Sequence, residues 1–267
     1  MIYCNLKGGL GNMMFQIAAT ESLAIDRGTD CSFPNLYQQL NNLNNYNLYN
    51  RAVSTDGYME IFKSLKWNSP PTKRIGVYNY PFHFAYHSLP NDDIMIDGFF
   101  QSEKYFVHNR EGVLDLFRVP NSILDTINEK YTDLLKKRTT SIHVRRGDYL
   151  KHPDVHPVQT PEYYKHGMEL LKDQTDIFIV CSDDIPWCKE NIKGDNVVYI
   201  EDEREYVELY LMSLCNNNII CNSSFGWWGA WLNESPNKIV IGPKIWFGTK
   251  NNHLNTDDVI PETWIKI

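Results

Sequence analysis

A regular alternation of short apolar segments with amphipathic segments, which starts near Pro120, constrains the fold of this chain more than any other feature. Apolar side chains recur at helical spacing over residues 121–137, 161–172, 185–191, 205–215 and 225–232. Five short apolar segments typical of strands occur at 141–144, 177–181, 197–200, 219–221 and 238–241. Strands separated by helices form parallel βα units, so we predict a Rossmann-like half with five parallel strands over residues 121–267.

The first 120 residues predict a separate α/β half. A strand over residues 1–6 is followed by the loop Gly8-Gly9-Leu10-Gly11-Asn12 and by a helix that ends at Gly28. Residues 35–50 are rich in Asn, Tyr and Leu, and we expect an ordered but irregular insert there. Residues 68–110 carry several prolines and predict loops with short strands. The division near residue 120 depends only on this change of pattern.

Composition argues against several classes of protein. The 267 residues carry a formal net charge of −7 and no basic stripe, so we expect no nucleic-acid binding. The six cysteines have no C-x-x-C spacing, which disfavours a zinc or redox site, and we expect them to be reduced in a cytoplasmic protein. The N-terminus does not resemble a signal peptide. No apolar run approaches the ~20 residues that span a membrane, so we expect no transmembrane segment.

The segment from Ser141 to Asp148, with the sequence SIHVRRGD, is the strongest candidate for chemistry. It predicts a strand that ends and is followed by Arg145, Arg146, a glycine and Asp148. Ligands of doubly wound sheets lie beyond the carboxyl ends of strands, and the planar guanidinium matches phosphate oxygens. This arrangement suits a diphosphate, while a surface salt-bridge corner is the structural alternative.

A second candidate is the segment CNSSFGWWGA, which begins at Cys221. A predicted strand leads through Asn222, Ser223 and Ser224 into an apolar helix that starts near Phe225. Backbone N–H groups at a helix N-terminus bind anions, whereas Ser223 or Ser224 could instead cap the helix. The two interpretations are compatible.

The N-terminal glycine loop and three carboxylates are weaker candidates. The loop resembles G-x-G-x-x-G but has Met14 in place of the last glycine, so it predicts either a close backbone approach to a ligand or a tight turn. Asp183 and Asp184 follow a predicted strand, where helix capping is the structural alternative. Glu208 lies within a predicted helix on the side of its apolar residues.

Three blocks of this sequence resemble glycosyltransferase family 11, the α-1,2-fucosyltransferases. They are GGLGNMMFQ from Gly8, HVRRGDY from His143 and NSSFGWWGAWL from Asn222, and their order matches the family over about residues 1–242. The second block is shared in looser form with α-1,6- and protein O-fucosyltransferases. Met13 departs from the Gln usual in the family, and Glu208 stands where we expect Asp.

The resemblance implies a GT-B type fold with two Rossmann-like halves. Residues 1–120 would form the half on the acceptor side, and residues 121–267 the half that binds the nucleotide sugar. The implied reaction is inverting transfer of L-fucose from GDP-β-L-fucose to the 2-hydroxyl of a terminal β-galactoside. It implies no metal and no cofactor. The chain contains no D-x-D triplet, which metal-dependent glycosyltransferases usually need. An oligosaccharide or polysaccharide acceptor is implied, and residues 35–110 are expected to select it.

The resemblance also implies roles for single residues. Arg145 would contact the β-phosphate, which carries the developing charge of the leaving group. Asp148 is the candidate general base, unless a neighbouring arginine makes it a structural partner. The candidate substrate-binding residues are Gly11 and Asn12 facing the diphosphate and acceptor, His143 and Glu208 near the guanine, Arg146 and Asp183, and Asn222, Ser223, Ser224 and Phe225 around the diphosphate.

Two other functions remain open at the level of sequence. One is another kind of fucosyltransferase, of the protein O-fucosyl or α-1,6 type. The other is a catalytically inactive protein that binds a nucleotide sugar. Release of GDP upon addition of an acceptor would discriminate an enzyme from a binding protein. The sequence predicts neither the acceptor glycan nor the oligomeric state.

Overall fold

The computed structural model describes residues 1–45, 55–65, 70–72, 74–80, 84–89 and 93–267. Within these residues the chain forms two compact units. Unit 1 comprises the described residues of Met1–Tyr46 and Ser54–Arg118, together with Leu254–Pro261. Unit 2 consists mainly of Val119–His253 and Glu262–Ile267. The return of Leu254–Pro261 to unit 1 differs from the predicted organisation, in which all residues after 120 form one half.

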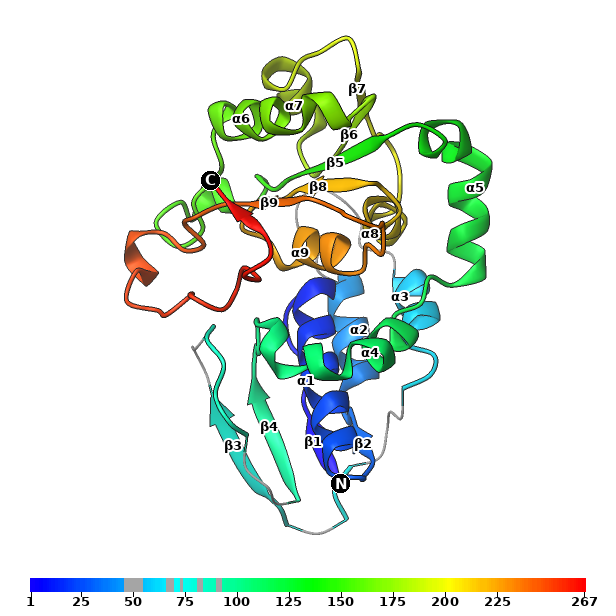
Figure 1. Cartoon of the computed structure of the whole chain (residues 1–267). Coiled ribbons are helices and arrows are strands. Elements are labelled where there is room, and N and C mark those ends of the chain that lie inside the picture. Colours follow the sequence, from blue (N-terminus) through cyan, green and yellow to red (C-terminus); the bar gives the residue numbers. More distant parts are fainter. Residues whose placement is uncertain (46–54, 66–69, 73, 81–83, 90–92) are drawn as a thin grey trace. The chain divides into compact units, whose positions relative to one another are not determined.

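Unit 2 contains a fully parallel six-stranded sheet (Figure 1). Its order is β10-β9-β8-β5-β6-β7, and every neighbouring pair is parallel. The five predicted strands are all present, and the sixth, β10, was missed because it has two exposed residues and no apolar run. The strands are β5 (Thr139–Val144), β6 (Ile177–Ser182), β7 (Val197–Tyr199), β8 (Asn217–Ile219), β9 (Val240–Gly242) and β10 (Ile265–Lys266).

Helices cover both faces of this sheet, α6 and α7 on one and α8 and α9 on the other (Figure 1). The core beneath α6 and α7 consists of alternate residues of the strands, including Ile142, Val144 and Val180, and of Tyr164 from α6. The helices are α5 (Asn121–Leu135), α6 (Pro161–Leu171), α7 (Ile185–Asn191), α8 (Glu205–Ser213) and α9 (Ser224–Trp231). The hydrophobic periodicity therefore predicted these five helices and five of the six strands.

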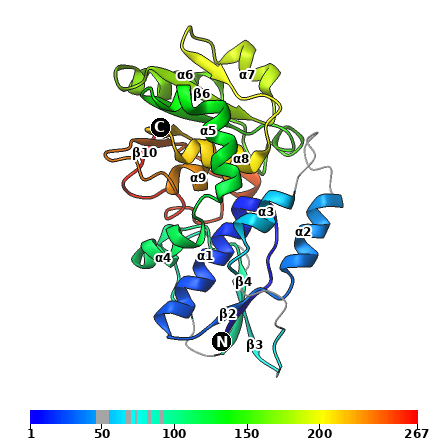
Figure 2. The same ribbon diagram turned by 90° about the vertical axis from the view of Figure 1, so that its right-hand side faces the viewer.

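Unit 1 contains a smaller parallel sheet with the order β2-β1-β4-β3. Helices α1 and α4 lie on one side of it and α2 lies on the other (Figure 2). Helix α1 ends as predicted, because Gly28 adopts the left-handed conformation (φ +55°) that closes a helix. The elements are β1 (Ile2–Cys4), α1 (Leu10–Asp26), β2 (Cys31–Ser32), α2 (Leu36–Asn45), α3 (Thr55–Ile61), β3 (Gly76–Tyr80), β4 (Ile94–Gly98) and α4 (Arg110–Leu116).

The expected irregular insert at residues 35–50 is wrong for its first part. Residues Leu36–Asn45 form helix α2, because Leu36, Leu40 and Leu43 recur at helical spacing and are all buried. This apolar stripe outweighs the low helix propensity of the many Asn residues between them. Residues 46–50 of the predicted insert lie outside the described residues.

Short 3₁₀ helices connect several of these elements: η2 (Glu103–Tyr105), η3 (Val107–Asn109), η4 (Tyr149–Lys151), η5 (Lys172–Gln174) and η6 (Thr249–Asn251). All six cysteines are free and buried. Among the described residues, no helix has both the length and the apolar character needed to cross a bilayer.

Candidate active site

The order of the strands in unit 2 reverses at β5. From β5 the chain adds β6 and β7 on one side and then crosses to β8 and β9 on the other. The loops after β5 and β8 therefore diverge at the carboxyl edge of the sheet, and this switch point is where doubly wound sheets bind ligands. Most of the predicted site residues of unit 2 lie here, in the loops after β5, β6 and β8.

Arg145 follows the last residue of β5 and is clamped between two carboxylates. Its Nε and Nη2 donate to Oδ1 of Asp148 at 3.1 and 2.8 Å, and its Nη1 lies 3.1 Å from Oδ2 of Asp183. The side chain of Arg145 is 19% exposed, so the guanidinium is held in place at the surface of the switch point. Asp148 is thus a partner of Arg145, and its role as a general base stays a prediction.

Arg146 extends to different partners from those of Arg145. Its Nε donates to Oδ2 of Asp184 at 2.9 Å, and its guanidinium stacks 4.0 Å from the centroid of the Trp187 ring. Asp184 also caps α7 by accepting from the backbone N–H of Trp187. These contacts brace α7 against the loop. The predicted contact of Arg146 with a substrate stays a prediction.

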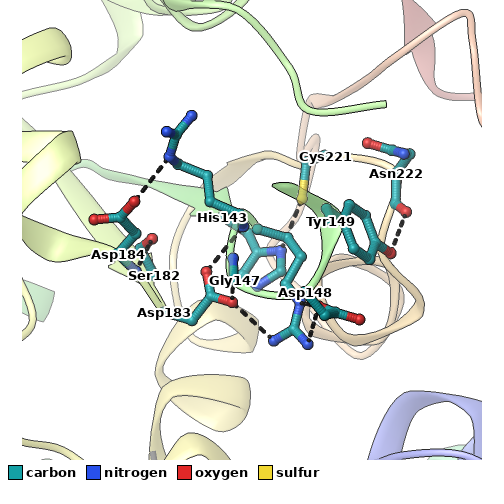
Figure 3. Close-up of polar contacts among 11 residues, drawn as sticks. His143, Gly147, Asp148, Tyr149, Ser182, Asp183, Asp184, Cys221 and Asn222 are labelled. Carbon is teal, nitrogen blue, oxygen red and sulfur yellow. Dashed lines mark hydrogen bonds and ion pairs between the residues drawn. The ribbon is translucent and has the colours of Figure 1, made fainter. Parts of the chain in front are cut away.

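Asp183 organises the arginine loop. Its Oδ1 accepts from the backbone N–H of Arg146 at 2.9 Å, and its Oδ2 accepts from the N–H of Gly147 at 3.0 Å (Figure 3). Asp183 is not the cap of α7, since Asp184 holds that position. One nearly buried carboxylate therefore sets both the backbone of the loop and the position of the Arg145 guanidinium.

The N-terminus of α9 presents backbone donors beside this loop. Ser223 occupies the N-cap position with an extended backbone, but its side chain makes no capping hydrogen bond. The N–H of Ser223 donates to the carbonyl of Cys221, and the first intrahelical bond is donated by Trp227. The N–H groups of Ser224, Phe225 and Gly226 therefore have no intrahelical acceptor, as at any helix start. Together with the helix dipole, they form an anion-binding end.

His143, on β5, packs directly against the first turn of α9. A Cβ on Gly226 would lie 2.5 Å from Nδ1 of His143, so only glycine permits this approach. The ring of Phe225 lies 5.3 Å from the ring of His143. The contact joins the end of β5 to the first turn of α9, the helix that follows β8.

Burial makes His143 neutral. Desolvation, with a smaller contribution from Arg145, lowers the pKa of His143 to about 3. Its Nδ1 lies 3.3 Å from Sγ of Cys221, and burial raises the pKa of that thiol to about 12. When the thiol hydrogen is donated to Nδ1, the hydrogen of the imidazole resides on Nε2. The buried ring then offers a neutral N–H donor.

Tyr149 and Asn222 brace the switch point, and the sequence analysis did not identify the role of Tyr149. The Tyr149 hydroxyl donates to the carbonyl of Asn222 at 3.0 Å, which joins the loops after β5 and β8 (Figure 3). The side chain of Asn222 accepts from Gln159 and donates to the carbonyl of Trp246. Asn222 thus anchors the turn from inside, and a direct substrate contact by this residue stays a prediction.

The remaining predicted residues lie elsewhere. Glu208, on α8, is buried, with 3% of its surface exposed. Burial and Glu203 are the larger causes of the raised pKa of Tyr131 on α5, and the charge of Glu208 is a smaller one. Gly11 and Asn12 belong to the first turn of α1 in unit 1. Among the described residues, no group of three or more His, Cys, Asp or Glu side chains is arranged to hold a metal ion.

Comparison with solved structures identifies the class of this fold. The chain resembles an α-1,6-fucosyltransferase, NodZ, solved after soaking with GDP-fucose, with a TM-score of 0.55 over 90% of this chain and 94% of the other, at 12% identity. Two parallel α/β units with this likeness define a fold of the GT-B type.

The whole chain, residues 1–267, matches the model of glycosyl transferase family 11, and the chain belongs to this family. It is 31% identical to an α-1,2-colitosyltransferase from Escherichia coli, over 100% of this chain and 99% of the relative. It is also 31% identical to galactoside α-(1,2)-fucosyltransferase 1 from Leontopithecus chrysomelas, over 55% of this chain and 45% of that protein. The chain is accordingly a glycosyltransferase.

Proposed function

We propose that this protein is an inverting galactoside α-1,2-fucosyltransferase, which transfers L-fucose from GDP-β-L-fucose to the 2-hydroxyl of a terminal β-galactoside. The family supports glycosyl transfer. The names of two relatives support an α-1,2 linkage, and one of them supports both fucose and a galactoside acceptor. The acceptor is an oligosaccharide or polysaccharide, and no metal takes part.

The observation that carries this proposal is that Arg145 and the N-terminus of α9 lie at the same switch point. A departing GDP gains negative charge on its β-phosphate, and donors already in place stabilise that charge. Arg145, oriented by Asp148 and Asp183, would contact this phosphate. The N–H groups at the start of α9 would bind the remaining diphosphate oxygens. These donors supply the electrostatic role that a divalent cation has in other glycosyltransferases.

Two buried side chains would recognise the rest of the nucleotide. His143 stays neutral because its pKa is lowered to about 3, so it contributes a hydrogen bond and no charge. A carboxylate such as Glu208 accepts hydrogen bonds from N1–H and the exocyclic amine of guanine, a pattern that adenine does not offer. We therefore assign guanine selection to Glu208 of α8.

A specific observation favours a second candidate donor. One relative that spans this whole chain is an α-1,2-colitosyltransferase, so transfer of colitose is the alternative to transfer of fucose. Parallel assays with GDP-fucose and GDP-colitose, at equal donor concentration and with lactose as acceptor, separate the two. A higher kcat/KM for colitose would replace fucose in the proposal.

The decisive experiment compares Arg145→Lys with the matched variant Arg146→Lys in steady-state kinetics, with NMR of the product linkage. Lysine cannot make the two-pronged contact of Arg145, and loss of one oxyanion-type donor costs roughly 10²–10³ in kcat. Arg146→Lys should have a smaller effect, since an ammonium can still pair with Asp184. A near-normal kcat for Arg145→Lys, or no transfer by the parent enzyme from either donor, would overturn the proposal.

A further inference from the structure

Unit 1 has a switch point of its own, at the carboxyl edge between β1 and β4. The chain runs from β1 to β2 on one side and then crosses to β3 and β4 on the other, in a sheet whose pairs are all parallel. Since the loops after β1 and β4 diverge here, the topology that locates a ligand site in unit 2 locates one in unit 1 as well. Its side chains differ in kind from those of unit 2.

An ion pair beside an aromatic ring lies at this edge. Nζ of Lys7, after β1, lies 2.5 Å from Oδ1 of Asp97 on β4 and 5.1 Å from the centroid of the Phe99 ring. The side chains of Lys7 and Asp97 are 38% and 35% exposed, and Phe99 is half-buried. The two charges offset each other, so this ion pair carries no net charge.

A pair of amides is linked to the same loop, because Nε2 of Gln16 donates to the backbone carbonyls of both Lys7 and Asn12 at 2.8 Å. Nε2 of Gln101 donates to Oδ1 of Asn12 at 2.7 Å, and Gln101 is only 7% exposed. The described residues offer no hydrogen-bond partner to Nδ2 of Asn12 or to Oε1 of Gln101. One donor and one acceptor therefore remain beside the glycine loop.

Two residues with left-handed backbone conformations lie beside the amide pair. Phe100, between Phe99 and Gln101, is buried and adopts φ +49°, a left-handed conformation that bulky side chains avoid. Gly8 is also left-handed (φ +80°), and a Cβ there would lie 2.6 Å from Nδ2 of Asn12. Such strain persists only where the surrounding structure enforces it, and it clusters at functional sites.

We propose that Lys7, Asp97 and Phe99, together with Asn12 and Gln101, form the subsite that binds the acceptor sugar. A neutral polyol requires balanced donors and acceptors with no net charge, and an apolar ring matches the C–H face of a galactopyranoside. The ion pair and the amides recognise its hydroxyl groups, and Phe99 packs against the ring. This inference rests on the proposed function, and it assigns acceptor recognition to these five residues of unit 1.

The test uses the full chain with lactose as the acceptor. Asp97→Asn removes the charge of the carboxylate while keeping its shape, and loss of a charged hydrogen bond should raise the KM for lactose roughly 10- to 100-fold. Phe99→Ala should raise this KM as well. Neither change should alter the affinity for GDP measured by calorimetry.

The matched control is Asp93→Asn. Asp93 pairs with the N-terminal ammonium of Met1 at 2.5 Å, at the opposite edge of the same two strands. This control should leave the KM for lactose unchanged. Circular dichroism of each variant separates loss of binding from loss of folding, and Asp97→Glu, which keeps the charge, should recover part of the affinity.

The outcomes separate the subsite from the proposed function. If saturation-transfer NMR detects lactose on the parent protein and Asp97→Asn abolishes it, the subsite stands even where no fucose is transferred. If Asp97→Asn leaves the KM unchanged in an enzyme that fucosylates lactose, the subsite is wrong and the function stands. A loss of GDP affinity in Asp97→Asn would also overturn the subsite. If lactose neither binds to the parent nor accepts fucose, both are overturned.

Discussion

Replacing Gly226 with alanine tests how closely α9 approaches β5. A Cβ at this position would lie 2.5, 2.8 and 3.0 Å from Nδ1, Cγ and Cβ of His143. His143 cannot yield easily, because it is 5% exposed and packs between Cys221 and Phe225. Overpacking of this kind costs about 1–3 kcal/mol, whereas alanine in place of glycine in a helix gains up to about 1 kcal/mol. We expect a net loss of about 1–2 kcal/mol.

The same change should weaken binding of GDP. The first turn of α9 must move to relieve the contact, and its backbone donors move with it. Loss of one charge-assisted hydrogen bond corresponds to roughly 10- to 100-fold in affinity. Titration calorimetry with GDP measures this effect, and thermal unfolding followed by circular dichroism measures the loss of stability.

Gly112 provides a matched control. It is the third residue of α4, as Gly226 is the third residue of α9, but its Cβ would meet only Cδ1 of Ile25 at an ordinary 3.5 Å. Gly112→Ala should stabilise the protein by about 0.5–1 kcal/mol and leave GDP affinity unchanged. If Gly226→Ala behaves like Gly112→Ala in both assays, the close packing of His143 does not position the anion-binding turn.

Three further predictions concern unit 2 and its binding of the nucleotide. Transfer should persist in excess EDTA because arginine and backbone donors hold the diphosphate, and strict dependence on added Mg²⁺ or Mn²⁺ would contradict this. The pKa of His143 is lowered from its ordinary 6.5 to about 3 in the folded protein. The neutral ring therefore makes its full contribution to the stability of the protein above pH 6.5, and this contribution is lost as the pH falls toward 3. Between pH 7 and 5 the free energy of unfolding should fall by about 2 kcal/mol less in His143→Gln than in the parent, as urea titrations would measure; equal losses would refute the burial argument. Glu208→Gln should weaken GDP binding far more than it raises the KM of the acceptor, and an unchanged GDP affinity in calorimetry would restrict Glu208 to a structural role.

The larger elements could be predicted because each carries its own periodic pattern. Leucines and isoleucines at helical spacing indicated α5, and short apolar segments indicated β5 and β6. The resemblance to the family assigned the loops that carry Arg145 and Ser223 to one diphosphate site, and the parallel strands place the carboxyl ends that precede both loops at one edge. Two-residue β10 has no such pattern, because its pairing with β9 supplies the order that its own residues lack.

The direction of the charged side chains could not be predicted. Arg145 and Arg146 are adjacent and identical in type, yet one contacts Asp148 and Asp183 and the other contacts Asp184 and Trp187. Successive residues that leave a strand point to different sides. Asp183 and Asp184 come from the loop after β6, whereas Asp148 lies in the same loop as the two arginines. Sequence spacing carries no information on which carboxylate lies on which side.

The sequence by itself determined the class of fold, the glycine loop that begins at Gly8, the arginine loop that begins at Arg145, and the family. Local periodicity and short motifs record these features directly. Only the tertiary structure decided which groups act together: Gly226 against His143, Tyr149 with the carbonyl of Asn222, and Lys7 with Asp97. The last two of these contacts join residues that are 73 and 90 positions apart in the sequence. They exist because parallel strands bring distant loops to a common edge, where burial and ion pairing then select the conformation of each side chain.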